Sequence, residues 1–176
     1  MASAPGFKYC AKNCEGLHVR VIARIAIHID RGRVLMHVDD NLDMSMTVLL
    51  LIAHGSRKAA ANDEIGRLAA RIEADADGEY AAVVPAFLEF AEPDIHCGID
   101  RCVALGAERI VALPYFLAGG RHVATDIPLE LACARAKYPQ VQIDLAPHIG
   151  ELEAMSRLVL QSAGQARAPS REGERA

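Results

Sequence analysis

Short apolar runs alternate with stretches of helical periodicity from Thr47 onward. The run TVLLLIA at residues 47–53 is continuous, as expected of a strand that is buried on both faces. Residues 60–74 then place apolar side chains at helical spacing. The pattern recurs and predicts strands over 80–90, 109–115 and 141–145 and helices over 93–105, 126–137 and 151–161. This alternation predicts an α/β fold: a four-stranded parallel sheet in the order 2-1-3-4, with helices on both faces.

Turn and capping residues support these boundaries. Gly106 is well placed to end the helix over 93–105. Asp126 is expected to cap the next helix, with Pro128 in its first turn.

The chain divides into three predicted parts: an N-terminal extension over 1–45, an α/β domain over 46–162 and a tail over 163–176. Apolar residues alternate over 18–29 and 34–38 around the turn sequence Asp30-Arg31-Gly32, which predicts a β-hairpin. An alternative for the extension is that translation begins at Met44 or Met46. The tail is rich in Gly, Pro, Arg and Glu and is expected to be disordered.

Composition excludes several classes of protein. Hydrophobic residues make up 52% of the chain and charged residues 24%, which is typical of a globular protein with a core. The formal charge of −4 and the lack of a basic stripe argue against nucleic-acid binding. No apolar run reaches membrane-spanning length, and residues 1–6 do not resemble a signal peptide, so a cytoplasmic location is expected.

The cysteines are scattered along the chain. They are Cys10, Cys14, Cys97, Cys102 and Cys133. In a reducing compartment such a set favours free thiols over a disulfide framework. The pair Cys10 and Cys14 has metal-binding spacing, but no second pair completes a site.

Three side chains of metal-binding type follow three successive predicted strands. They are His54, with Gly55 behind it for a sharp turn, Glu89, and His122. In parallel sheets, ligands bind beyond the carboxyl ends of the strands. Two imidazoles and a carboxylate suit Co²⁺, Ni²⁺, Fe²⁺ or Zn²⁺ and leave coordination positions open. The same groups are able to accept protons.

Simpler interpretations exist for each of these residues. A histidine after a strand is more often a capping or hydrogen-bonding residue, and Glu89 is either solvent-facing or functional. Arg57 and Arg121 are either solvated or bind carboxylates of a ligand. His148 reaches a similar rim with weaker support. The remaining histidines, on expected strand or helix faces, are His18, His28, His37 and His96.

Three segments around these residues resemble the short, single-domain sirohydrochlorin chelatases, which are related to the class II chelatases. They are LLLIAHGSR at 49–57, AFLEFAEPDI at 86–95 and LPYFLAGGRHVATDIP at 113–128, in the family's order, within 46–163. The resemblance implies that His54 and His122 bind the metal and that Glu89 assists metal binding or proton removal. It also implies a homodimer, because short forms supply half of the two-lobed architecture of longer chelatases. The extension over 1–45 departs from the family pattern.

The expected function is therefore that of a lyase that inserts Co²⁺, Fe²⁺ or Ni²⁺ into sirohydrochlorin, in cobalamin or sirohaem biosynthesis. The substrate carries carboxylates, and the expected substrate-binding residues are Arg57, Ser56, Gly119, Gly120 and Arg121. No nucleotide is expected, because the chain lacks a GxxxxGK[ST] loop.

Two alternatives stay open at this point. One is a metal or tetrapyrrole carrier without turnover. The other is a histidine phosphatase, although Ala53 occupies the position before His54 where those enzymes usually have arginine.

Overall fold

The computed structural model describes residues 26–30, 33–37 and 46–165, the first two ranges by their backbone alone. The chain separates into two compact units, Met1–Ser45 and Met46–Ala176. In the first unit, β1 (Ala26–Asp30) pairs antiparallel with β2 (Arg33–His37). This pairing agrees with the predicted hairpin, whose remaining residues lie outside the described ranges, as do Cys10 and Cys14.

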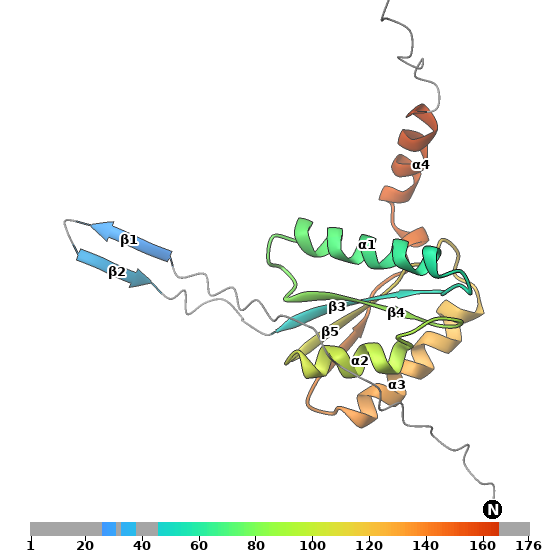
Figure 1. The fold of residues 1–176 in the computed structure, drawn as a ribbon, viewed down its shortest axis with the longest axis horizontal. Coiled ribbons are helices and arrows are strands. Elements are labelled where there is room, and N and C mark those ends of the chain that lie inside the picture. The colour runs from blue at the N-terminus through green and yellow to red at the C-terminus, as the bar shows by residue number, and fades with distance from the viewer. Residues whose placement is uncertain (1–25, 31–32, 38–45, 166–176) are drawn as a thin grey trace, which may run out of the picture. The chain divides into compact units, whose positions relative to one another are not determined.

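The second unit is built on a parallel sheet (Figure 1). Its strands are β3 (Thr47–Ala53), β4 (Ala82–Phe87), β5 (Arg109–Pro114) and β6 (Gln142–Leu145). They pair in the order β4-β3-β5-β6, so the sequence prediction of four parallel strands in the order 2-1-3-4 is confirmed.

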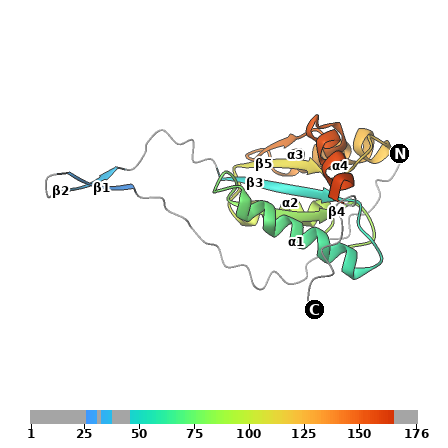
Figure 2. The same ribbon diagram turned by 90° about the horizontal axis from the view of Figure 1, so that it is seen from above.

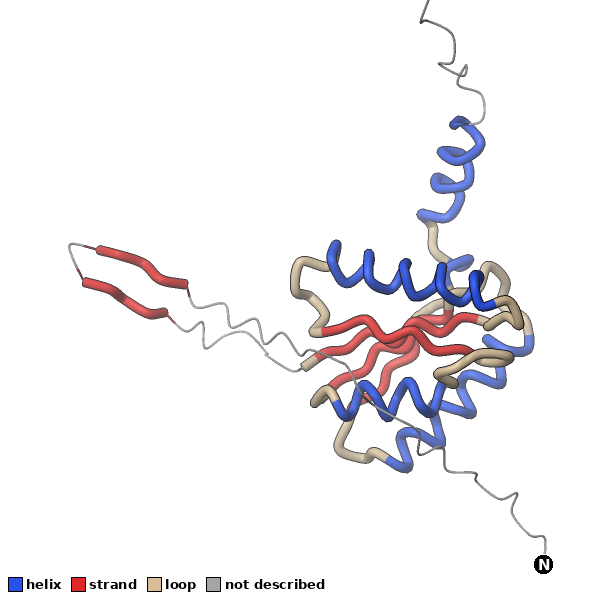
Figure 3. Tube along the Cα trace, viewed as in Figure 1, coloured by secondary structure: helices blue, strands red, loops and turns tan. Residues whose placement is uncertain are grey.

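Helices cover both faces of this sheet, also as predicted. Helix α1 (Ala59–Asp75) lies on one face, and α2 (Ile95–Ala104) and α3 (Ile127–Lys137) lie on the other (Figures 1 and 3). Seen from above, α1 lies over the β3–β4 side of the sheet (Figure 2). Helix α4 (Ala154–Gln165) extends away from the sheet and has no buried residue. No helix in the described part of the chain is long and apolar enough to cross a membrane.

Strand β3 explains why its sequence reads as one apolar run. Leu50 and Ile52 pack in the core under α2 and α3, together with Ile99 of α2. Leu49 and Leu51 point to the other face and pack against α1. Successive side chains of a strand point to opposite faces, so a strand covered on both sides has no polar position.

Several boundaries differ from the predicted ones. The helix expected over 93–105 begins at Ile95, because the Asp94 side chain accepts a hydrogen bond from the N–H of Cys97 over 2.7 Å and caps it. Its end at Gly106, with φ +88°, agrees with the prediction. The last helix is displaced: a 3₁₀ turn over Ile149–Glu151 comes first, and α4 then runs on to Gln165, into the predicted tail.

Candidate metal centre

His54 stands directly after β3, at the carboxyl edge of the sheet, with an exposed side chain. Gly55 follows with φ +89°, a conformation that glycine adopts freely. A Cβ atom at this position would lie 1.8 Å from the carbonyl oxygen of Glu89. The backbone N–H of Glu89 in turn donates to the carbonyl of His54 over 2.9 Å. Glycine is required at residue 55, because the loops after β3 and β4 touch there through their backbones.

His122 begins the segment that joins the β5 loop to α3. Residues His122–Asp126 form a single π-helical turn, in which the N–H of Ile127 bonds back to the carbonyl of His122. Such turns are rare and occur frequently at functional sites. Nδ1 of His122 lies 2.8 Å from Oδ2 of Asp126. An ionised carboxylate only accepts hydrogen bonds, so Nδ1 is the donor, and in the neutral imidazole Nε2 carries the lone pair.

Asp126 corrects one prediction. The sequence favours a capping role, but the Asp126 side chain makes no capping hydrogen bond, and the backbone of this residue is already helical. The π-helical turn extends the helix back to His122, so Asp126 no longer lies at a free helix end. Its carboxylate instead contacts His122 and, at 3.6 Å, Nε of Arg121. The His-x₃-Asp spacing is the sequence signal that identifies this pair.

The imidazole rings of His54 and His122 lie beside each other, with centroids 5.3 Å apart and planes at 84°. Metal–imidazole bonds are about 2.1 Å long, so two histidines on one tetrahedral ion have centroids roughly 5 Å apart. Nδ1 of His54 lies 3.3 Å from the carbonyl oxygen of Gly55. Nε2 is therefore the nitrogen that each ring would offer to an ion. The structure brings two of the three predicted ligands together.

Glu89 lies at the same edge, but its carboxylate and the two imidazoles do not form a trio of ligand atoms that all lie within 4.8 Å of one another. Among the described residues, the trio of metal-binding side chains whose ligand atoms all lie within 4.8 Å of one another is Glu92, Asp94 and Cys97. Within that trio, Asp94 caps α2 and Glu92 accepts from the N–H of Asp94 over 3.2 Å, so helix capping accounts for both carboxylates. The role of Glu89 as a ligand stays a prediction.

The buried cysteine of the core, Cys102, is not suited to bind a metal ion. Cys102 and Cys133 are free thiols, as the sequence predicts for them. Burial raises the pKa of Cys102 to about 12, and a backbone hydrogen bond offsets this only in part. A thiol with that pKa stays protonated near neutral pH and is a poor metal ligand.

The predicted substrate-binding residues surround the histidine pair in two loops. In the first loop, Ser56 is fixed by Asn62, which accepts from the Ser56 N–H over 2.9 Å and donates to its carbonyl over 2.8 Å. Arg57 lies over the ring of Phe90, with Cζ 4.9 Å from the ring centroid. In the second loop, the Arg121 side chain is 85% exposed. Both arginines are thus available to anions at the rim.

Gly119 and Gly120 belong to the second loop, which is held by contacts with residues after β6. A Cβ atom on Gly119 would lie 3.4 Å from Cε1 of His148. Gly150 donates to the carbonyl of Phe116 over 2.9 Å, and a Cβ atom there would lie 2.0 Å from the Leu117 carbonyl oxygen. The close backbone contact at Gly150 fixes the loop that leads to His122.

Aromatic side chains flank His54, and the sequence interpretation did not single them out. The ring of Phe90 lies 6.1 Å from that of His54 at 29°, and the ring of Phe116 lies at 6.3 Å and 57°. The sequence places aromatic residues near predicted ligands in Leu88-Glu89-Phe90 and Tyr115-Phe116. This position is only a weak indication of a functional role, because aromatic residues usually belong to the hydrophobic core.

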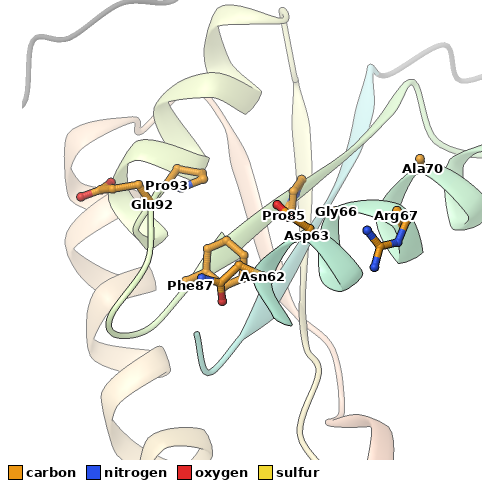
Figure 4. A pocket seen from close by; sticks show the side chains of 9 residues that line it. All are labelled: Asn62, Asp63, Gly66, Arg67, Ala70, Pro85, Phe87, Glu92 and Pro93. Carbon is orange, nitrogen blue, oxygen red and sulfur yellow. The ribbon is translucent and has the colours of Figure 1, made fainter. Parts of the chain in front are cut away.

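Two cavities in the described part of the chain lie away from the histidine pair. The larger, of about 460 Å³, is lined by α1, β4 and the start of the loop before α2, with Asn62, Arg67 and Glu92 among its polar side chains (Figure 4). The other, of about 430 Å³, lies between α1 and Tyr115. Neither is lined by a predicted site residue.

Comparison with known proteins gives a family match over most of the second unit. The family model described as CbiX matches residues 48–166. The sirohydrochlorin cobaltochelatase of Priestia megaterium is 33% identical over 123 residues, which cover 68% of this chain and 39% of that protein. The chain spans 36% to 44% of the length of the curated relatives that it matches first.

Solved structures share the fold. A CbiX protein of cobalamin biosynthesis from Marinobacter aquaeolei has a TM-score of 0.58 and 27% identity, covering 68% of this chain and 96% of that one. The sirohydrochlorin chelatase SirB from Bacillus subtilis subspecies spizizenii, in complex with cobalt, has a TM-score of 0.61 and 30% identity. The match covers 68% of this chain and 50% of the SirB chain. With the family model spanning β3 to α4, this chain belongs to the CbiX family.

Proposed function

We propose that this protein is a chelatase that inserts a divalent metal ion, Co²⁺, Fe²⁺ or Ni²⁺, into sirohydrochlorin. The observation that carries the proposal is the pairing of His54 and His122, with ring centroids 5.3 Å apart, at the carboxyl edge of a sheet of the CbiX family. The related protein from Priestia megaterium is named for cobalt insertion into the same substrate class. The metal is a substrate, held by Nε2 of each ring and then passed to the macrocycle.

The chemistry is an exchange of two protons for one ion. Two pyrrole N–H bonds break, two protons leave, and the metal forms bonds to the ring nitrogens. A group beside the metal must therefore accept protons as the ion enters. Glu89, exposed at the same edge, is one candidate for the acceptor, and Nε2 of His122 is the other once it has released the ion. The exposed guanidinium groups of Arg57 and Arg121 are placed to meet carboxylates of the substrate.

The histidine pair gives the first test. His54→Ala and His122→Ala should each lower the rate of metal insertion by about 100-fold or more, because each removes a ligand that also positions the ion. The assay follows the absorbance change as Co²⁺, Fe²⁺ or Ni²⁺ enters sirohydrochlorin under anaerobic conditions, corrected for the spontaneous reaction. Glu89→Gln should impair turnover more than metal affinity.

The control is His96→Ala. His96 lies on α2 and pairs with Glu130 of α3, so its loss should leave turnover near normal. Unchanged rates in both His54→Ala and His122→Ala would refute the proposed site. Binding of metal and tetrapyrrole without turnover in the unmutated protein would identify a carrier instead.

We also propose that the protein acts as a homodimer. Support comes from α4, which has no buried residue and leaves Leu158, Val159 and Leu160 exposed at 56%, 59% and 72%. Exposed apolar side chains of this size on one helix are typical of an interaction surface. The exposed position of His54 adds support, since one copy leaves the metal pair on an open rim.

Light scattering tests this second proposal. The unmutated protein should have twice the mass of one chain, and Leu158→Glu combined with Leu160→Glu should lower it. The control is Ser162→Glu, which adds a charge at an exposed position of the same helix. It should leave the measured mass unchanged. A monomer with full activity would contradict the proposal. A cytoplasmic location is proposed as well, supported by the free thiols at Cys102 and Cys133.

A further inference from the structure

Phe90 combines two features that are unfavourable for a phenylalanine. Its backbone has φ +62°, a left-handed conformation that is rare for bulky residues other than glycine. Its side chain is 54% exposed, so the ring gains little from burial. Strained residues of this kind cluster at functional sites, where surrounding contacts hold them in place.

The ring of Phe90 contacts two residues of the proposed metal centre, His54 and Arg57. The ring lies at 29° to that of His54, with centroids 6.1 Å apart, and Arg57 stacks on it with Cζ 4.9 Å away. The backbone is fixed one residue earlier, where Glu89 donates to the carbonyl of His54 over 2.9 Å. Phe90 is therefore held beside a metal ligand with much of its ring turned to solvent.

We infer that Phe90 binds the macrocycle itself, as an aromatic surface against which the flat face of the tetrapyrrole packs next to His54. This inference rests on the proposed chelatase function. A conjugated ring system stacks well on an aromatic side chain that is nearly parallel to the adjacent imidazole. Arg57, on the same ring, is then positioned for a carboxylate at the macrocycle's edge. Phe90 sets where the ring lies relative to the ion, and so contributes to substrate specificity.

The decisive variant is Phe90→Gly, which removes the ring and suits the left-handed backbone better than phenylalanine does. We expect the dissociation constant of metal-free sirohydrochlorin, measured by its fluorescence, and the KM to rise about tenfold. The kcat should stay within about threefold, and Tm should not fall. Phe90→Asn, whose side chain also tolerates this conformation, serves as a second variant, and Phe90→Tyr should restore binding.

Tyr115→Leu is the matched control, since Tyr115 is also an exposed aromatic residue after a strand, at 41%, but lines the cavity beside α1. It should leave KM unchanged. If the unmutated protein is active and KM is unchanged in Phe90→Gly and Phe90→Asn, the role of Phe90 is refuted, whereas the proposed chelatase function is not. A loss of dimer mass in these variants would overturn it too, by assigning Phe90 to a subunit contact. If unmutated protein neither binds nor metallates sirohydrochlorin, the proposed function itself fails, and this inference with it.

Discussion

At the scale of single residues, the centre depends on how each imidazole is oriented as much as on its presence. His122 is held by Asp126, whose Oδ2 lies 2.8 Å from Nδ1, and this contact fixes the orientation of the imidazole ring. Nδ1 of His54 has a longer hydrogen-bond contact, 3.3 Å, with the carbonyl of Gly55. The two histidines are therefore not equivalent, and His122 is the more firmly fixed.

Asp126→Asn tests this difference. The amide keeps the shape of the side chain but loses the charge, so His122 should bind metal more weakly and the insertion rate should fall about tenfold. Asp144→Asn is the control: Asp144 also pairs with a cationic side chain, Arg109 at 2.7 Å, but lies on β6 outside the centre. Equal rates for the two variants would show that Asp126 does not act on His122.

At the scale of elements, the sheet was predictable and the turn carrying His122 was not. The continuous apolar run of β3 and the spacing of α1 follow directly from burial, so these elements could be inferred from the sequence. The π-helical turn over His122–Asp126 has no comparable pattern, because it depends on backbone hydrogen bonds within a single turn. For the same reason, Asp126 looked like a helix cap.

The junction between the loops after β3 and β4 gives an element-scale prediction. Gly55→Ala should destabilise the fold by about 2 kcal/mol or more, since the added Cβ meets the Glu89 carbonyl at 1.8 Å and φ is +89°. Urea unfolding measures the loss. Gly66→Ala is the matched control, because a Cβ atom there meets nothing within 4 Å and Gly66 lies inside α1.

The control should change stability in the opposite direction. Alanine favours the helix over glycine by roughly 0.5–1 kcal/mol, so Gly66→Ala is expected to stabilise the protein. If Gly55→Ala were as stable as the unmutated protein, the two loops would not be in backbone contact.

At the scale of the whole molecule, the second unit is compact by itself. The division falls between Ser45 and Met46, directly before β3. A chain beginning at Met46 should therefore fold, with a cooperative thermal transition, and should insert metal at the rate of the full chain. A chain beginning at Leu51 lacks half of β3, the central strand, and should not fold. Failure of the Met46 chain to fold would show that the extension is part of the core.

The backbone contact between Gly150 and Leu117 limits how this protein is able to evolve. Gly150 lies between β6 and α4, whereas Leu117 lies in the loop that leads to His122, and no side chain fits between them. An insertion or a larger residue at 150 would displace Leu117 and, through it, the approach to His122. Changes that reposition α4 must therefore arise beyond residue 150, so Gly150 has little freedom to vary although it lies outside the histidine pair.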